Sequence, residues 1–490
     1  MNNLTLFSVL FPILAGAALF IWRPTDRIIR NRYSITVVLM TSALVLGTAV
    51  CSWLYGAEAM TVTLIKMSKY LVFEFSPDKV SLVFGCIIGV LWPVTTIYAF
   101  NYMEHEGNDN MFFGFFIITF GVVAGIAYSA NFFTLYICYE FMTLVTLPLV
   151  MHSMDAKARS AGKKYVLYSM TGAALVFIAL MYFVNYADSL DFTYGGILDM
   201  ARVAGHENEL MLVFVLAFFG FGVKAAIFPF HRWLPAASVA PTPVTALLHA
   251  VAVVKSGAFA VMRLIYFGFG TELLRGTWAQ YLVLTAAAVT VIFGSCMSLR
   301  MPHLKRRLAY STVSNLAYIL VAFAAMSPLG LMGGLLHMIF HAVIKITLFF
   351  CAGSILHNSH LEYVYEMEGM AKKQPITCAV FVAASLGLMG IPPLGGFISK
   401  WTIATASAAN LSWAGYLGAA ALIVSAILTS LYMISVVVRF YFPLKSAPAL
   451  SEHCHEADAR MTGPLVFLTV LMIVLSLMSS GLYSWIGGMV

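Results

Sequence analysis

The stretch NFFTLYICYEFMTLVTLPLVM, residues 131–151, has the length and composition of a membrane-spanning helix, and it carries one carboxylate, Glu140. About 20 predominantly apolar residues are enough to cross the hydrocarbon core of a bilayer as a helix. A charge at the centre of that core costs at least ~2.5–3.5 kcal/mol, so such residues usually face a protein interior and mark an ion path. The sequence places no other acidic side chain deep within a span.

The composition extends this interpretation to the whole chain of 490 residues. It is 61% hydrophobic and 10% charged, and its mean hydropathy is +0.90. A soluble domain carries roughly 25% charged residues. The sequence therefore predicts an all-α polytopic membrane protein without a soluble domain.

Apolar stretches of spanning length recur from end to end, and we expect about 14 spans. The first of them has no Lys or Arg before it and is expected to be a permanent span rather than a signal peptide. The expected spans are 4–22, 33–54, 77–101, 111–129, 131–151, 164–186, 209–229, 241–267, 277–299, 308–327, 329–356, 374–406, 412–440 and 463–488.

The basic residues orient the chain. With the N-terminus outside, inner connections hold 18 of the 28 Lys and Arg, outer connections hold four, and six fall within spans. An excess of Lys and Arg marks the cytoplasmic side. We therefore expect a multi-pass protein of a cell inner or plasma membrane with both termini on the outer face. An alternative role for the basic turns is contact with anionic lipid.

Two of the expected spans are interrupted by Pro and Gly next to a lysine. Span 7 contains GFGVKAAIFPF (220–230) with Lys224, and span 12 contains LMGIPPLGGFISK (388–400) with Lys400. Pro and Gly weaken backbone hydrogen bonding, which is tolerated at membrane depth only where protein or water satisfies the backbone. An alternative for Lys400 is that it caps the carbonyl end of the first half-helix.

The two interrupted spans are five apart, which predicts two inverted five-helix repeats, as found in secondary transporters. Three N-terminal spans in 1–110 are expected to precede the repeats. The first repeat is expected in 111–267 and the second in 277–440, and a C-terminal span in 463–490 follows.

Further ionisable residues fall within spans 8 and 11. Lys255 follows His249 by two helical turns, and its alternative role is snorkelling to a headgroup. His337, His341 and Lys345 recur every four residues and share one helix face. Histidine titrates near neutral pH and suits proton transfer, whereas structural hydrogen bonding and metal binding are the alternatives.

The remaining motifs indicate no cofactor, metal site or nucleic-acid binding. The seven cysteines are scattered without a CxxC pair, which argues against an iron–sulfur or zinc site. EHCHE, residues 452–456, has the composition of a metal cluster, but it lies in a polar connection and is interpreted as a solvated loop.

Three motifs resemble one known family. They are KAAIFPFHRWLP (224–235) followed by APTPVTALLHA (240–250), then LKRRLAYSTVSNLAY (304–318), then HMIFHAVIKITLFF (337–350). They resemble the antiporter-like proton-translocating subunits. These include subunits L, M and N of respiratory complex I, subunits A and D of Mrp antiporters, and membrane subunits of energy-converting hydrogenases. The resemblance covers about residues 75–440.

The resemblance implies roles for individual residues. Glu140 matches the family's span-5 glutamate, Lys224 its span-7 lysine and Lys255 its span-8 lysine. His337, His341 and Lys345 match the polar face of span 11, and Lys400 the ionisable residue of span 12. The family often has an acid and a histidine after TrpLeuPro, where this chain has Ala236 and Ser238.

These observations predict a proton path through Glu140, Lys224, Lys255, His249, the span-11 residues and Lys400. An opposite charge favours ionisation, so Glu140 and Lys224 are expected to pair; a purely structural ion pair is the alternative. The chain has no evident catalytic centre, which leaves its enzyme status open. We expect a subunit of a redox-driven complex, with an Mrp-type sodium/proton antiporter subunit as the alternative and a non-transporting scaffold as a third class. Its partners would be further membrane subunits, protons or sodium, and the lipid bilayer.

Overall fold

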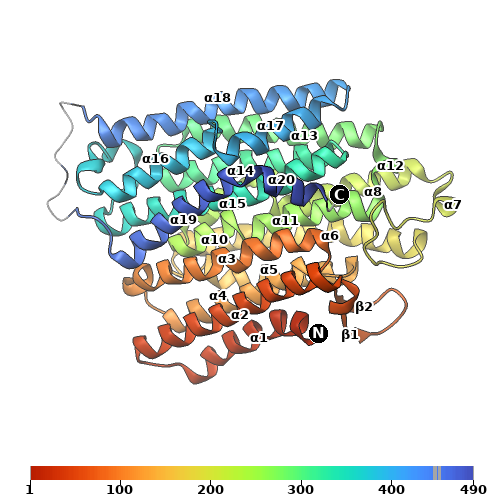
Figure 1. The fold of residues 1–490 in the computed structure, drawn as a ribbon, viewed down its shortest axis with the longest axis horizontal. Helices are drawn as coiled ribbons and strands as arrows, with labels where there is room; N and C mark the ends of the chain where they lie inside the picture. Colours follow the sequence, from red (N-terminus) through yellow and green to blue (C-terminus); the bar gives the residue numbers. More distant parts are fainter. Residues whose placement is uncertain (1, 445–449, 451–453, 489–490) are drawn as a thin grey trace.

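The computed structural model describes residues 2–444, 450 and 454–488. It consists of long helices that run side by side, with the N-terminal helices along one edge and α18 along the other (Figure 1). The first elements are α1 (Asn2–Trp22), α2 (Arg27–Tyr55), β1 (Val62–Lys66), β2 (Val72–Phe75) and α3 (Lys79–Tyr102). The two strands pair antiparallel in a small hairpin at one end of the bundle.

The middle of the chain adds helices of very unequal length. They are α4 (Asp109–Ala127), α5 (Phe132–Val150), α6 (Ala156–Tyr186), α7 (Met200–Val203), α8 (Glu207–Lys224), α9 (Trp233–Ala236), α10 (Thr242–Ala250), α11 (Val253–Arg263) and α12 (Thr271–Leu274). The turns at Leu264–Phe269 continue α11 as a π-helix.

The last part of the chain is again built from long helices. They are α13 (Trp278–Arg300), α14 (Leu304–Ala324), α15 (Pro328–Ser359), α16 (Pro375–Met389), α17 (Gly395–Ala408), α18 (Trp413–Tyr441), α19 (Ala459–Leu477) and α20 (Ser479–Gly487). The central helix α15 packs against α10, α14, α16, α17 and α19.

Eleven helices of the described residues are long and apolar enough to cross a membrane. The three further spans expected from the sequence correspond to α8, to α14 and to the pair α16 and α17. Helix α8 carries two glutamates and a lysine, and α14 begins with three basic residues. Helices α16 and α17 have only 15 and 14 residues, because the chain is interrupted between them.

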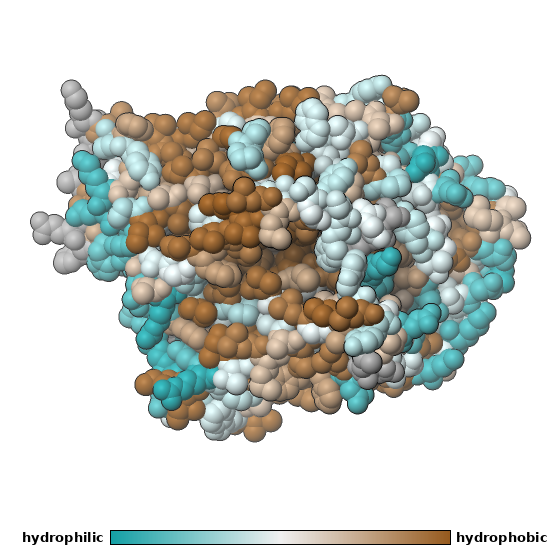
Figure 2. Space-filling model, in the orientation of Figure 1, coloured by the Kyte–Doolittle hydropathy of each residue, from teal (hydrophilic) through white to brown (hydrophobic). Residues whose placement is uncertain are grey.

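The surface of the bundle is that of a membrane protein. Figure 2 shows apolar side chains across the middle of the molecule and hydrophilic ones at its two ends. Large apolar side chains such as Leu14, Leu167 and Ile423 are more than half exposed. A soluble monomer rarely exposes apolar surface of this extent. The chain is therefore a multi-pass membrane protein.

The interruption after α8 has its backbone groups satisfied by protein. The indole Nε1 of Trp233 donates to the carbonyl of Val223 at 2.7 Å. The amide of Ile227 donates to Gly222 O at 3.0 Å, and that of Phe228 to Thr290 Oγ1 at 3.1 Å. Without such partners each exposed backbone group would cost several kcal/mol in the membrane. The chain can therefore leave the helix directly after Lys224.

A second interruption separates α16 from α17. Gly390 ends α16 with φ = +85°, a conformation that glycine adopts without a Cβ clash. The amide of Gly395 at the start of α17 donates to Ser476 Oγ on α19 at 2.9 Å. A shorter interruption at 251–252 separates α10 from α11, where the sequence predicts one continuous span. It falls between His249 and Lys255.

Candidate functional site

The eight ionisable residues predicted to act together come from six different helices. All are buried except Glu140, which is half-buried. Buried lysines and histidines in such number are unusual and are normally paired or hydrogen-bonded. The eight are Glu140 on α5, Lys224 on α8, His249 on α10, Lys255 on α11, His337, His341 and Lys345 on α15, and Lys400 on α17.

Lys224 connects α8 to α5. Its ammonium donates to the backbone carbonyl of Tyr139 and lies 3.4 Å from the centroid of the Tyr139 ring. The Tyr139 hydroxyl in turn donates to Phe221 O on α8 at 3.1 Å. A cation over an aromatic face gains electrostatic attraction, which is larger when water is excluded. The lysine therefore contacts the residue that precedes Glu140.

The expected direct pair of Glu140 and Lys224 is not formed among the described residues. Glu140 has one carboxylate oxygen buried without a hydrogen-bond partner, while the Lys224 head is engaged by Tyr139. The sequence could not show this, because the choice between a carboxylate and a neighbouring carbonyl depends on the side-chain position at a helix end. Lys224 on α8 thus contacts the residue next to Glu140 on α5, and no ion pair joins it to Glu140 among the described residues.

A chain of contacts joins α11, α15 and α17. The ammonium of Lys255 contacts Nδ1 of His341. The rings of His341 and His337 stack with centroids 5.7 Å apart. Nδ1 of His337 lies 2.9 Å from the hydroxyl of Ser399, which precedes Lys400. The structure therefore joins Lys255 to the two histidines of α15, and these to Ser399 beside Lys400, which sequence spacing alone could not show.

The contact of Lys255 with His341 determines which ring nitrogen of His341 carries the proton when the lysine is charged. An ammonium group has only donors, so opposite a charged lysine the Nδ1 of His341 must be an acceptor. The ring proton then resides on Nε2, which is buried without a partner in the described part of the chain. Transfer of one proton from lysine to imidazole would reverse these roles without moving either heavy atom.

The other two lysines are held by carbonyl oxygens. Lys345 donates to Leu308 O at 3.1 Å and to the hydroxyl of Ser311, both on α14. Lys400 donates to Leu388 O at 2.5 Å and to Met389 O at 3.2 Å. The Lys400 contacts are those of a cap on the carboxyl end of α16, which is the alternative role expected for this residue from the sequence.

His249 is placed differently from the other histidines. It is fully buried, and both ring nitrogens lack a hydrogen-bond partner among the described residues. Its ring centroid lies 4.9 Å from that of Phe349 on α15. Buried polar atoms without partners are rare in folded proteins, so both ring nitrogens of His249 are open to a further polar partner.

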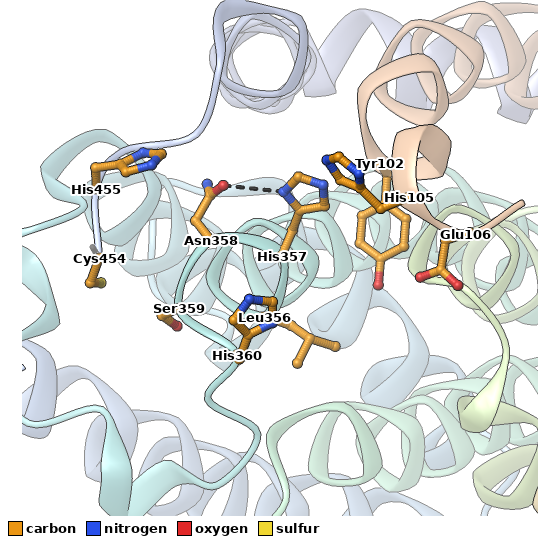
Figure 3. A pocket seen from close by; sticks show the side chains of 10 residues that line it. All are labelled: Tyr102, His105, Glu106, Leu356, His357, Asn358, Ser359, His360, Cys454 and His455. Carbon is orange, nitrogen blue, oxygen red and sulfur yellow. Dashed lines mark hydrogen bonds between the residues drawn. The ribbon is translucent and has the colours of Figure 1, made fainter. Parts of the chain in front are cut away.

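The pocket in Figure 3 is lined in part by Cys454 and His455, two of the three residues of 452–456 that the structure describes. Its volume is about 870 Å³, and its lining includes His105, His357, His360 and His455. Glu452 and His453 lie outside the described residues. In the part that is described, no group of His, Cys, Asp or Glu has the arrangement of a metal site.

Glu456 has a structural role in this connection. One carboxylate oxygen accepts from the amide of Ile376 at 2.7 Å, and the other accepts from the hydroxyl of Thr377 at 2.5 Å. Both partners lie in the first turn of α16. Carboxylates stabilise this end of a helix because its first amides have no partner within the helix.

Sequence reasoning missed two buried cations. Lys305 was counted among the basic residues that set topology, yet it is only 6% exposed and donates to Ala240 O at 3.0 Å. Arg263 is fully buried and forms two hydrogen bonds of 2.5 and 2.6 Å to the carboxylate of Asp78. The signal for Arg263 was its place in a span, but its partner lies 185 residues away.

A known protein family matches the part of the chain that contains the candidate residues. The family described as NADH:quinone oxidoreductase/Mrp antiporter, transmembrane, matches residues 129–429. The chain belongs to this family. The matched region contains all eight candidate residues, and it lies inside the range predicted from the three motifs.

Relatives of the chain come from several kinds of complex. The chain is 29% identical over 473 residues to NADH-quinone oxidoreductase subunit N of Desulforudis audaxviator, with 91% of this chain and 92% of that protein covered. It is 30% identical to subunit L of Campylobacter jejuni, covering 97% and 76% respectively. It is also 30% identical to hydrogenase-4 component B of Escherichia coli, covering 84% and 64%.

Solved structures share the fold along the whole chain. The Mrp complex of Dietzia sp. DQ12-45-1b contains a chain that superposes with a TM-score of 0.84 at 21% identity, covering 100% of this chain and 96% of that one. A chain of an archaeal membrane-bound sulfane sulfur reductase also gives a TM-score of 0.84, at 18% identity, covering 99% and 97%. The second of these structures is described as an archaeal respiratory membrane complex.

Proposed function

We propose that this chain is a proton-translocating, antiporter-like membrane subunit. The observation that carries the proposal is the buried series Lys255, His341, His337 and Ser399, which leads from α11 through α15 to α17 beside Lys400. Intramembrane ionisable groups mark ion and proton pathways, so their adjacency here supports a relay. Membership in the family supports the same role.

Glu140 and Lys224 would supply the charge change at the other end of the relay. In the described state the lysine is bound to Tyr139. Rotation of the Lys224 side chain toward the Glu140 carboxylate would favour the charged form of the lysine, because an opposite charge raises the proton affinity of an amine. Rotation of the side chain away from Glu140 would release a proton from the lysine. The backbone interruption directly after Lys224 gives this side chain a position at a helix end.

His249 would connect the two ends through water. Its two unpartnered nitrogens can each bind a water molecule, and a buried water typically makes about three hydrogen bonds to polar groups of this kind. The proposed path then includes Glu140, Lys224, His249, Lys255, the α15 residues and Lys400.

The proposed topology has 14 spans and two inverted five-helix repeats. It counts α8, α14 and the pair α16 and α17 as crossings in addition to the eleven apolar helices. The two interruptions beside Lys224 and Lys400 would occupy corresponding positions of the two repeats. The distribution of basic residues supports a cell membrane location with both termini on the outer face.

We further propose that the chain works in a redox-driven complex of the complex I or membrane hydrogenase type. The relatives named as NADH-quinone oxidoreductase subunits and as a hydrogenase component support this choice. The alternative is an Mrp-type antiporter subunit without a redox arm. It is supported by the structural likeness to the Mrp complex and by a relative named as a probable K(+)/H(+) antiporter subunit.

The relay is tested by Glu140→Gln in the intact complex. We expect initial proton translocation into membrane vesicles to fall by about 100-fold or more, because a group that takes up and releases protons contributes factors of that size. Glu58→Gln, which changes an exposed carboxylate outside the bundle, is the matched control. Normal translocation by Glu140→Gln would contradict the relay.

The class of complex is tested by purification of the tagged chain from its native membrane. Iron, nickel and flavin are then measured in the intact complex. Iron with nickel would indicate a hydrogenase-linked pump, and iron with flavin but no nickel a complex I-like dehydrogenase. A stable complex without redox metal would favour the Mrp alternative.

A further inference from the structure

A cavity of about 790 Å³ opens beside the interruption that follows Lys224. It lies between α6, the connection that contains α9, the end of α13 and the start of α14. Its lining divides into two chemical kinds. Phe228, Phe293 and Met297 supply apolar surface, and basic side chains supply charge.

The charge of this cavity is of one sign. Lys164, Arg232 and Arg306 line it, and no Asp or Glu does. All three basic side chains are exposed, and none forms a side-chain hydrogen bond or an ion pair with a described residue. Elsewhere on the same molecule Arg30 and Arg439 are paired with carboxylates at 2.6 and 2.5 Å. The three cations therefore remain available to an anionic ligand.

A neutral polar group also faces this space. His231 lines the cavity and is only 3% exposed, and its Nδ1 has no hydrogen-bond partner in the described part of the chain. Burial, together with the neighbouring Arg232, lowers the pKa of His231 to about 4. The ring is therefore neutral at physiological pH and can donate or accept one further hydrogen bond.

We propose that this cavity binds the phosphate group of an anionic phospholipid. The cavity has a basic part and an apolar part, which suits a ligand that is itself amphiphilic. The phosphate would lie among Lys164, Arg232 and Arg306, and an acyl chain would lie along Phe228 and Phe293. Phe228 is 38% exposed at the bundle surface, so an acyl chain that lies along it would reach the bilayer. Juxtamembrane Lys and Arg are the side chains that recognise anionic headgroups.

Binding at this place would also hold the connection after the interruption of α8. Arg232 is followed by Trp233, whose indole is bonded to Val223 one residue before Lys224. A headgroup that fixes Arg232 therefore restrains the backbone beside Lys224. Lipid binding can be measured without transport, so its failure and the failure of the proposed function are distinguishable.

The test compares phosphatidylglycerol with phosphatidylcholine by native mass spectrometry of the purified chain. We expect the wild type to retain one phosphatidylglycerol and to bind phosphatidylcholine poorly. The variant Lys164→Gln/Arg232→Gln/Arg306→Gln should bind phosphatidylglycerol about 100-fold more weakly, because each basic residue near an anionic headgroup contributes roughly fivefold.

A matched control separates a site from general electrostatics. Arg159, Lys163 and Arg300 are exposed basic residues that do not line the cavity, and Arg159→Gln/Lys163→Gln/Arg300→Gln should keep wild-type affinity. Equal weakening by the two triple variants would overturn the proposal. Equally strong binding of phosphatidylcholine would do the same, and so would displacement of the lipid by inorganic phosphate alone, which would indicate a free anion.

A single position on the cavity wall gives a second test. Ala236→Glu places a carboxylate among the three cations, and Ala236→Gln places a neutral side chain of the same size there. We expect the Glu variant to lose phosphatidylglycerol and the Gln variant to retain it. If both variants lose the lipid, steric blockage explains the result and the charge argument fails.

Discussion

Two groups of buried cations in this molecule differ in what balances their charge. Arg263 has a carboxylate partner, Asp78, and lies 4.6 Å from the ring centroids of Phe192 and Phe267. The lysines on α8, α11, α15 and α17 have no carboxylate in contact among the described residues. Carbonyl oxygens, a hydroxyl and an imidazole bind them instead.

Under the proposed relay, this difference distinguishes a structural charge from a transferable one. Arginine does not release its proton in proteins, and its planar fork suits a two-point contact with a carboxylate. A lysine held by neutral oxygens has no counterion in contact with it in the part of the chain that the structure describes. The first arrangement fixes α11 to the N-terminal cap of α3, and the second is the one that the proposed relay requires.

The largest effect on stability is expected from Arg263→Met. It leaves the Asp78 carboxylate without its partner, and breaking a buried ion pair from one side costs up to ~3–5 kcal/mol. The Asp78 side chain is 31% exposed, so partial solvation places the expected loss at the lower end. The measurement is the free energy of unfolding of the purified chain in detergent. Asp78→Asn/Arg263→Met should recover much of the loss, since Asn can still cap α3 as Asp78 does. Wild-type stability of Arg263→Met would remove the distinction between the two groups.

A smaller loss, of ~1–3 kcal/mol, is expected from Lys400→Met, because the carbonyls of Leu388 and Met389 lose their donor. The free energy of unfolding in detergent again measures it. Lys400→Gln keeps a donor and should restore part of the stability. If the residue also transfers protons, neither variant should translocate them. A Gln variant with full translocation would assign Lys400 to capping alone.

The smallest effect on stability is expected from Lys255→Met, within about 1 kcal/mol of wild type. The change removes a buried cation that has no carboxylate partner and replaces it with an apolar side chain of similar volume. Translocation should nevertheless be lost, because the contact with His341 is lost. The exposed Lys66 on β1 offers the control Lys66→Met. A large loss of stability would place Lys255 with Arg263 as a structural charge.

The sequence predicted the membrane class and the family because both depend on local information. Stretches such as 131–151 are apolar over the length of a bilayer, and the motifs at 224–235 and 337–350 are contiguous. The family match over residues 129–429 confirms the second prediction. The count of 14 spans rests on counting α8, α14 and the interrupted helix as crossings, and it stays a prediction.

The candidate residues could be chosen from the sequence, but their partners could not. Charges within apolar stretches are conspicuous, so Lys224, Lys255 and Lys400 were found directly. Lys305 escaped notice because it lies among basic residues at a helix start, where topology explains a lysine equally well. Its burial depends on Ala240, which comes from another part of the fold.

The sequence by itself determined that the chain lies in a membrane, which family it belongs to, and which ionisable side chains lie within apolar helices. Each of these follows from the cost of placing polar groups in hydrocarbon, which is felt residue by residue. Only the tertiary structure decided that Lys224 binds Tyr139 rather than Glu140, that Lys255 meets His341 rather than His249, and that Arg263 meets Asp78. Those choices depend on distances of a few ångströms between helices remote in sequence, and hydrogen bonds and ion pairs form only at such distances.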